Sequence, residues 1–188
     1  MITRNDNAEI PSTAANAVWL VILTLAGLGG SLGISCITPF VALAVALAGT
    51  VRLAVALRAM LAIWLLNQLI GFTFLNFPRT PNTFLWGLAI GAAALLSTVA
   101  AASLLKRTAT FPTITGLSFA LLFGYAVYES TLFVAALFLG GVETFAPAII
   151  AQIGFVNVVW FVGLAALNAL VAVLLKPWLG PAPRLARA

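Results

Sequence analysis

Residues 17–49 decide the fold; their sequence is AVWLVILTLAGLGGSLGISCITPFVALAVALAG. This stretch is almost unbroken apolar sequence, too long for one ordinary membrane span of about 17–25 residues. A glycine cluster at residues 27–33 and then Thr38-Pro39 interrupt it. Because glycine weakens a helix and proline favours a first helical turn, we predict two spans joined by a tight turn near residues 33–38. The alternative is one long, broken helix and a chain of five spans.

The rest of the chain divides into similar apolar segments at its charges, prolines and glycine clusters. Each segment is long enough to cross about 30 Å of hydrocarbon as a helix. We therefore predict an all-α integral membrane protein with a bundle of six transmembrane helices over residues 17–175. Residues 1–16 form a polar tail and residues 176–188 a basic one. The predicted spans are residues 17–34, 39–57, 59–77, 84–105, 114–139 and 146–175.

The composition requires a lipid environment. Of the 188 residues, 63% are hydrophobic and 7% are charged, and the mean hydropathy is +1.17. A soluble domain is about half apolar and about a quarter charged. A soluble fold of this length lacks the interior volume to hide so much apolar surface. The bilayer is therefore the predicted solvent of the bundle, with no separate soluble domain.

The basic residues orient the chain. A net charge of +5 would suggest nucleic acid in a soluble protein, but here the charges lie in short loops and at the ends, so we predict no nucleic-acid partner. With six spans, eight of the nine basic residues fall on one side and only Arg79 on the other, a strong positive-inside bias. Five spans would largely remove this bias. We predict a bacterial inner-membrane protein with both termini in the cytoplasm, in which Arg52, inside the second span, snorkels to the surface.

Several kinds of chemistry are excluded. The chain has no histidine and one cysteine, Cys36, so it has neither a histidine general base nor an intrachain disulfide. A zinc site needs three or four protein ligands, and no independent protein metal site is predicted. The sequence also lacks a phosphate-binding loop, so ATP hydrolysis would require a partner.

Cys36 is predicted at the outer mouth of the bundle. It has two interpretations: a small, inert, buried residue, or a soft thiolate ligand for a metal that a macrocycle already holds. A lipoprotein signal before Cys36 is a poor fit, because Asp6 and Glu9 accompany the single Arg4.

Polar residues inside the predicted spans are the other site candidates. Asn67 and Gln68 lie in the third span, and Glu129 is the only acidic residue within a span. The amides either join helices or line a ligand cavity. An intramembrane carboxylate is a functional candidate, and Tyr125, four residues earlier, shares its helix face. Glu129 alternatively forms a structural hydrogen bond. Its candidate partners are Asn157 and Asn168, while Gly87 and Gly91 in the fourth span predict close helix packing.

Three short runs resemble a known family. They are SCITPFVALA (35–44), WLLNQLIGF (64–72) and TPNTFLWG (80–87). These runs resemble the small vitamin-binding membrane proteins called BtuM, which are similar to the substrate-binding S-components of energy-coupling-factor (ECF) transporters. The resemblance extends over roughly residues 17–175, with its motifs in the first half.

The resemblance implies a six-helix fold, a cobalamin-binding cavity open to the outside, and uptake of vitamin B12. In family members with a cysteine at this kind of site, the thiolate coordinates the cobalt of cobalamin and displaces cyanide from cyanocobalamin. On this chain that metal-binding and decyanating residue would be Cys36. The residues expected to contact the corrin amides or the nucleotide tail are Asn67, Gln68, Asn76, Asn82, Tyr125 and Glu129.

Two other functions remain open from the sequence. The chain is alternatively an S-component for another vitamin or a metal ion, with an ECF-type ATPase module as its partner. It is alternatively a structural membrane protein that has no substrate, which predicts a tightly packed bundle without an outward cavity.

Overall fold

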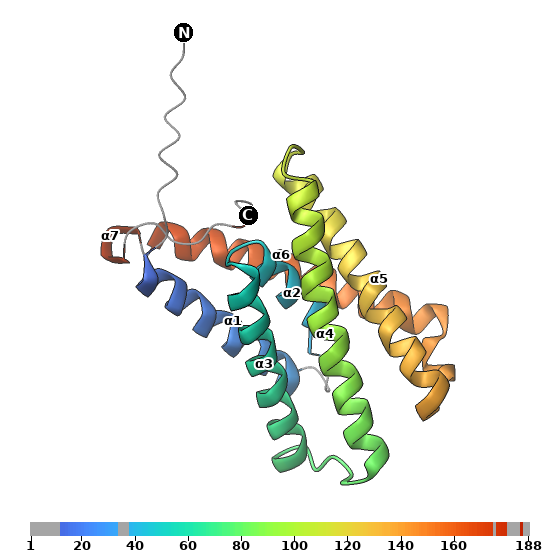
Figure 1. The fold of residues 1–188 in the computed structure, drawn as a ribbon. Coiled ribbons are helices and arrows are strands. Elements are labelled where there is room, and N and C mark those ends of the chain that lie inside the picture. The colour runs from blue at the N-terminus through green and yellow to red at the C-terminus, as the bar shows by residue number, and fades with distance from the viewer. Residues whose placement is uncertain (1–11, 34–37, 175, 180–184, 186–188) are drawn as a thin grey trace.

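The computed structural model describes residues 12–33, 38–174, 176–179 and 185, and over these residues it contains helices and no strand. Figure 1 shows the elements in chain order. They are α1 (Thr13–Gly33), α2 (Phe40–Ala48), α3 (Leu53–Thr73), α4 (Pro81–Arg107), α5 (Thr113–Leu139), the 3-10 helix η1 (Val142–Phe145), α6 (Pro147–Leu174) and α7 (Lys176–Leu179).

Four of these helices, α3, α4, α5 and α6, are long and apolar enough to cross a membrane. Helix α1 is apolar over the shorter range Thr13–Gly29. Helix α2 has nine residues, and at 1.5 Å per residue it is about 14 Å long, under half the thickness of the hydrocarbon core. The prediction of an all-helical chain with long apolar helices is confirmed, but the count of six spans is not.

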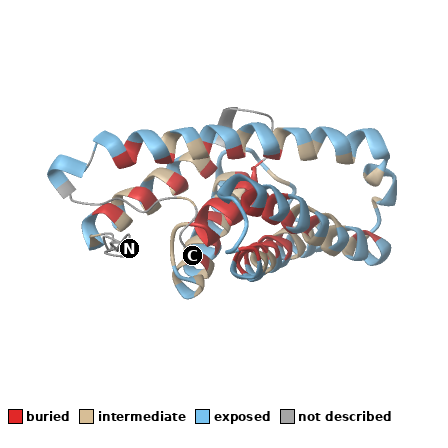
Figure 2. Ribbon diagram, turned by 90° about the horizontal axis from the view of Figure 1, so that it is seen from above, coloured by how far each residue is buried: buried red, intermediate tan, exposed pale blue. Residues whose placement is uncertain are grey.

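The outer surface of the bundle is apolar. Large side chains such as Leu122, Phe138 and Phe155 are more than half exposed. Figure 2 shows that buried positions gather where helices face one another, while exposed positions run along their outer faces. A continuous apolar surface of this kind is unfavourable in water. The exposed side chains therefore indicate a membrane location.

Helix α2 occupies the core, and all nine of its residues are buried. It packs against α3, α4, α5 and α6. The predicted second span over residues 39–57 is wrong as a single helix, because α2 ends at Ala48 and α3 begins at Leu53. The division of residues 17–49 into two helices is as predicted, since α1 ends at Gly33 and α2 begins at Phe40. Residues 34–37 of the predicted turn lie outside the described residues.

Arg52 explains where the second predicted span fails. It is exposed and forms the N-cap of α3 with an extended backbone, so it lies in a connection and not inside a helix. Just before it, the Thr50 hydroxyl donates a hydrogen bond to the Ala46 carbonyl at 2.6 Å. Thr50 also accepts one from Nε1 of the fully buried Trp19 at 3.1 Å. The α2–α3 connection is thus attached to α1.

The connections between the long helices lie at two opposite ends of the bundle. In Figure 1, α3 begins at the upper end, where α4 also ends, and the α3–α4 connection lies at the opposite end. Arg52 and Arg58 therefore share the upper end with Lys106 and Arg107, while Arg79 belongs to the opposite connection. This arrangement matches the charge sorting predicted for these residues.

Two glycines of α4 receive side chains of α3. A Cβ atom at Gly91 would lie 2.6 Å from Trp64 Cε2, and one at Gly87 would lie 2.6 Å from Gln68 Oε1. Trp64 Nε1 donates a hydrogen bond to the Gly87 carbonyl at 2.9 Å. The close packing predicted at Gly87 and Gly91 is confirmed, and it positions Gln68 as well as Trp64.

Substituting Gly91→Ala should destabilise the bundle by about 1–3 kcal/mol, because the new methyl group overlaps the Trp64 ring and forces it to move. The matched control is Gly163→Ala, since nothing lies within 4 Å of a Cβ there. That control should be neutral or stabilising by up to about 1 kcal/mol, because alanine favours a helix. Both values are measured by denaturation in detergent, and equal effects would contradict the packing argument.

Candidate functional site

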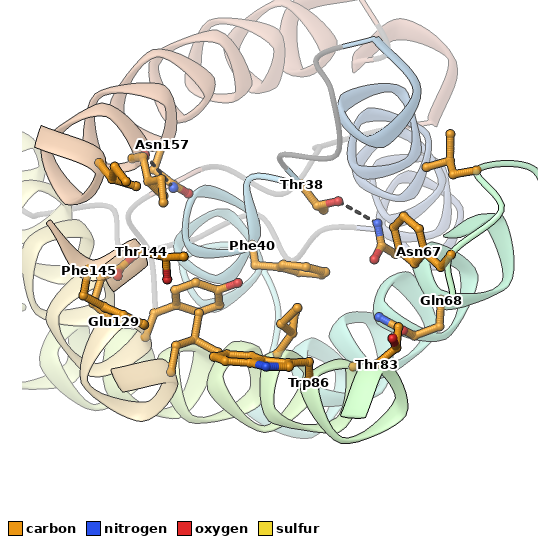
Figure 3. Close-up of a pocket in the computed structure, with 18 of the residues that line it drawn as sticks. Thr38, Phe40, Asn67, Gln68, Thr83, Trp86, Glu129, Thr144, Phe145 and Asn157 are labelled. Atoms are coloured by element: carbon orange, nitrogen blue, oxygen red, sulfur yellow. Dashed lines mark hydrogen bonds between the residues drawn. The ribbon is translucent and has the colours of Figure 1, made fainter. Parts of the chain in front are cut away.

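A cavity of about 620 Å³ opens among the described helices, and we call it the central cavity. Its wall is formed by the start of α2, the end of α3, the start of α4, the second half of α5, η1 and the first half of α6. Figure 3 shows side chains from these elements facing one space. The cavity lies toward the α3–α4 and α5–α6 connections, and its volume is in the range of cavities that enclose drug-sized ligands.

The amides of α3 form one side of the cavity. Asn67 Nδ2 donates a hydrogen bond to Thr38 Oγ1 at 2.7 Å, the pair drawn with a dashed line in Figure 3. Gln68 follows Asn67 and reaches the cavity beside Gly87, where the missing side chain of the glycine leaves room for it. A side chain at position 87 would therefore change this wall directly.

Asn157 of α6 lies across the cavity and caps α2. Its Oδ1 accepts a hydrogen bond from the Ala42 backbone N–H at 3.2 Å, and its Nδ2 donates to the Ile153 carbonyl at 3.0 Å. The first N–H groups of a helix lack intrahelical partners. In the buried start of α2, Asn157 supplies one of the missing acceptors.

Glu129 of α5 is a lining residue of the cavity, and one of its carboxylate oxygens, Oε1, is buried and has no hydrogen-bond partner among the described residues. The Tyr125 hydroxyl donates to the Ile150 carbonyl, and Asn157 bonds to Ala42 and Ile153. The suggested pairing of Asn157 with Glu129 Oε1 is therefore wrong. Asn168, the other suggested partner, accepts a hydrogen bond from the Leu185 backbone N–H. An unpaired polar atom in a buried place costs free energy, so Oε1 is the least satisfied group of the wall.

Aromatic rings make up much of the remaining wall. The rings of Phe40 and Tyr128 lie 6.4 Å apart between centroids. Trp86, Phe77 and Phe145 also line the cavity, from α4, the α3–α4 connection and η1. The site thus combines apolar ring surface with a few amide, hydroxyl and carboxyl groups.

The structure brings some of the predicted site residues together and separates others. Asn67, Gln68 and Glu129 line the central cavity. Asn76 and Asn82 are exposed and do not line it, because they belong to the α3–α4 connection and the first turn of α4. Tyr125 is directed to the Ile150 carbonyl and is not part of the wall. Cys36 lies outside the described residues, two positions before the lining residue Thr38.

Several lining residues are not among the predicted site residues. The wall includes Gln152 and Asn157 from α6, Thr83 from the first turn of α4 and Thr144 from η1. Gln152 and Asn157 are polar residues in the half of the last segment that was predicted to face outward, and that pattern was a usable signal. The threonines gave no signal, because a threonine hydroxyl commonly bonds to its own helix.

The cavity provides few groups for direct metal binding. Over the described residues, no three side chains of histidine, cysteine, aspartate or glutamate lie together as metal ligands. The functional groups that face the space are suited to hydrogen bonding and to contact with rings.

Replacing Asn157 with leucine should lower the free energy of unfolding by about 1–3 kcal/mol, because the buried Ala42 N–H loses its acceptor. Val159→Ala on the same helix is the control, since Val159 is 52% exposed and makes no comparable contact. Thermal denaturation in detergent measures both variants. Unchanged stability of the Asn157→Leu variant would show that Asn157 does not cap α2.

Comparison of the chain with known proteins found no matching family model, no matching curated protein and no matching solved structure.

Proposed function

We propose that this chain is a membrane-embedded substrate-binding protein of the transport type, with its ligand in the central cavity. The observation that carries the proposal is the wall itself, where Gln68, Asn67 and Glu129 line one space of about 620 Å³. One carboxylate oxygen of Glu129 is also buried without a hydrogen-bond partner among the described residues. Polar groups at membrane depth are costly and mark substrate pathways. A bundle that served only as a scaffold would gain stability by filling this space with apolar side chains.

The proposed topology keeps six crossings of a bacterial inner membrane with both termini in the cytoplasm. Helix α2 is then the helical part of the second crossing, preceded by Thr38 and Pro39 in a non-helical conformation. Non-helical backbone is tolerated at membrane depth where protein encloses it, and the burial of Thr38, Pro39 and all of α2 meets that condition. The central cavity would then open to the outer side, as uptake requires.

The topology is tested by labelling single cysteines in a Cys36→Ala background. The two variants are Asn82→Cys, at the start of α4, and Thr110→Cys, in the connection between α4 and α5. Both positions are exposed. A membrane-impermeant maleimide applied to the outer face of spheroplasts should label the first variant and not the second, because the two connections lie at opposite ends of α4. Permeabilised cells serve as the control for reactivity. If only the Thr110→Cys variant were labelled, the chain would have the opposite orientation in the membrane, and the proposed topology would be wrong.

The first candidate ligand is cobalamin or a related corrinoid, which the resemblance to BtuM proteins supports. Corrin side chains carry amides, and Asn67 and Gln68 offer complementary hydrogen bonds. Cys36 would supply the axial cobalt ligand, and decyanation would be a ligand exchange in which the thiolate sulfur binds cobalt and cyanide leaves as its anion. A corrinoid with its nucleotide tail is larger than the drug-sized ligands that such a volume encloses, so part of it would stay outside the cavity.

Cyanocobalamin added to the purified protein should change its cobalt absorbance spectrum, because sulfur replaces cyanide on the metal. With the Cys36→Ala variant, cyanocobalamin should keep the absorbance spectrum that it has in buffer without protein. Growth rescue of a B12-dependent strain that lacks its own uptake system, with and without Cys36, measures transport. An identical spectrum with wild type and Cys36→Ala protein would remove Cys36 as the cobalt ligand.

The second candidate is an S-component for a smaller vitamin, and the cavity volume favours it. A ligand of ordinary vitamin size would fit within this volume. Such a protein needs an ATPase module, so ATPase subunits should co-purify with it from the native membrane. Mass spectrometry of the molecule retained by the purified protein distinguishes the two candidates, because a corrinoid and a small vitamin differ greatly in mass.

A further inference from the structure

Among its described lining residues, the central cavity has an acidic side chain and no basic one. Among the residues that the structure describes in this wall, Glu129 is the only carboxylate, and there is no lysine or arginine. Arg79 follows the lining residue Pro78 but is exposed and is not part of the wall. The Tyr125 hydroxyl, one turn from Glu129, already donates its proton to the Ile150 carbonyl. The described wall therefore contains no cation to pair with the Glu129 carboxylate.

The rings of the wall suit a positive charge as well. Phe40, Tyr128, Trp86, Phe77 and Phe145 all line the cavity. The face of an aromatic ring carries negative electrostatic potential and attracts a cation within about 6 Å of its centroid, most strongly for tryptophan. Tyr128 and Glu129 are consecutive on α5, and Figure 3 shows Trp86, Phe40 and Glu129 bordering the same space. Several aromatic rings that line one pocket are a common way of binding a quaternary ammonium group.

We propose that the central cavity selects an organic monocation with an apolar or aromatic body, with Glu129 as its counter-ion and the ring of Trp86 in contact with the charged group. This inference rests on the proposed binding function and narrows its second candidate, a small ligand, to one chemical class. A cavity of about 620 Å³ is much larger than a bare ion, so an organic body fills the space that the charge alone leaves empty. The amides of Asn67 and Gln68 then bind polar groups at the other end of the ligand.

The test compares two probes of the same shape that differ only in charge. Phenyltrimethylammonium is the cation, and tert-butylbenzene is its neutral isostere. Their dissociation constants are measured by equilibrium dialysis against the full-length protein in detergent. Wild-type protein should bind the cation, and Glu129→Gln, which keeps the size of the side chain, should weaken that binding at least about 30-fold. Affinity for the neutral probe should be the same in both proteins.

Two further variants separate the cavity from the rest of the surface. Trp86→Leu should weaken binding of the cation by up to about 30-fold while affecting the neutral probe less, because it removes the ring face. Glu143→Gln is the matched control, since Glu143 is an exposed carboxylate of η1 outside the cavity wall. It should bind the cation as wild type does. The thermal stability of each variant, measured without probe, identifies any variant that fails to fold. If Trp86→Leu fails to fold, the comparison of Glu129→Gln with wild type decides the test.

The outcomes distinguish this inference from the proposed function. Equal affinity of wild type for both probes, or an unchanged cation affinity in Glu129→Gln, would overturn the selection for cations and leave a binding protein for neutral ligands. Failure of wild type to bind the cation would also overturn it. The proposed function itself fails on a separate result, which is the absence of any retained molecule when the protein is purified from its native membrane.

Discussion

The backbone of α2 is the constraint on which the rest of the bundle depends. A helix of nine residues is too short to cross the hydrocarbon, and its terminal N–H and C=O groups have no water to bond with. The surrounding helices meet this need in two ways. They bury every residue of α2, and Asn157 of α6 accepts a hydrogen bond from the Ala42 N–H. The positions of α4, α5 and α6 around the core follow from that requirement.

The start of α2 also borders the central cavity, and this divides the polar groups of the wall by role. Asn157 and Asn67 bond to protein partners, Ala42 and Thr38, on two sides of the place where α2 begins. These two amides fix the position of the backbone at the start of α2, and only their remaining hydrogen-bonding capacity is available to a ligand. Glu129 Oε1 differs, because no described residue bonds to it. The shape of the cavity and its charge preference therefore come from different side chains.

Hydropathy and charge were enough to predict a helical membrane protein and the ends of α4, α5 and α6 within about three residues. The start of α3 was predicted too late, at residue 59 instead of Leu53. Hydropathy and charge failed at residues 39–57, because Gly49 to Arg52 interrupt an apolar run whose hydropathy does not reveal a turn. In the site, Asn67, Gln68 and Glu129 were predictable as rare polar residues inside spans. Asn76 and Asn82 lie outside the cavity wall, and the sequence could not show this because the polarity of a loop residue does not show where its side chain is directed. Trp86, Phe40 and Tyr128 were missed because aromatic residues in spans more often pack against lipid or helices.

The bond between Asn157 and Ala42 joins residues 115 positions apart, and this separation has a consequence for synthesis. When α2 leaves the ribosome, the helices that will enclose it have not been made. It must wait at the membrane beside α1 and α3 until α6 is inserted. Completion of the core is therefore a late event in biogenesis, and a nascent chain that stalls before α6 would expose an uncapped helix to quality-control proteases.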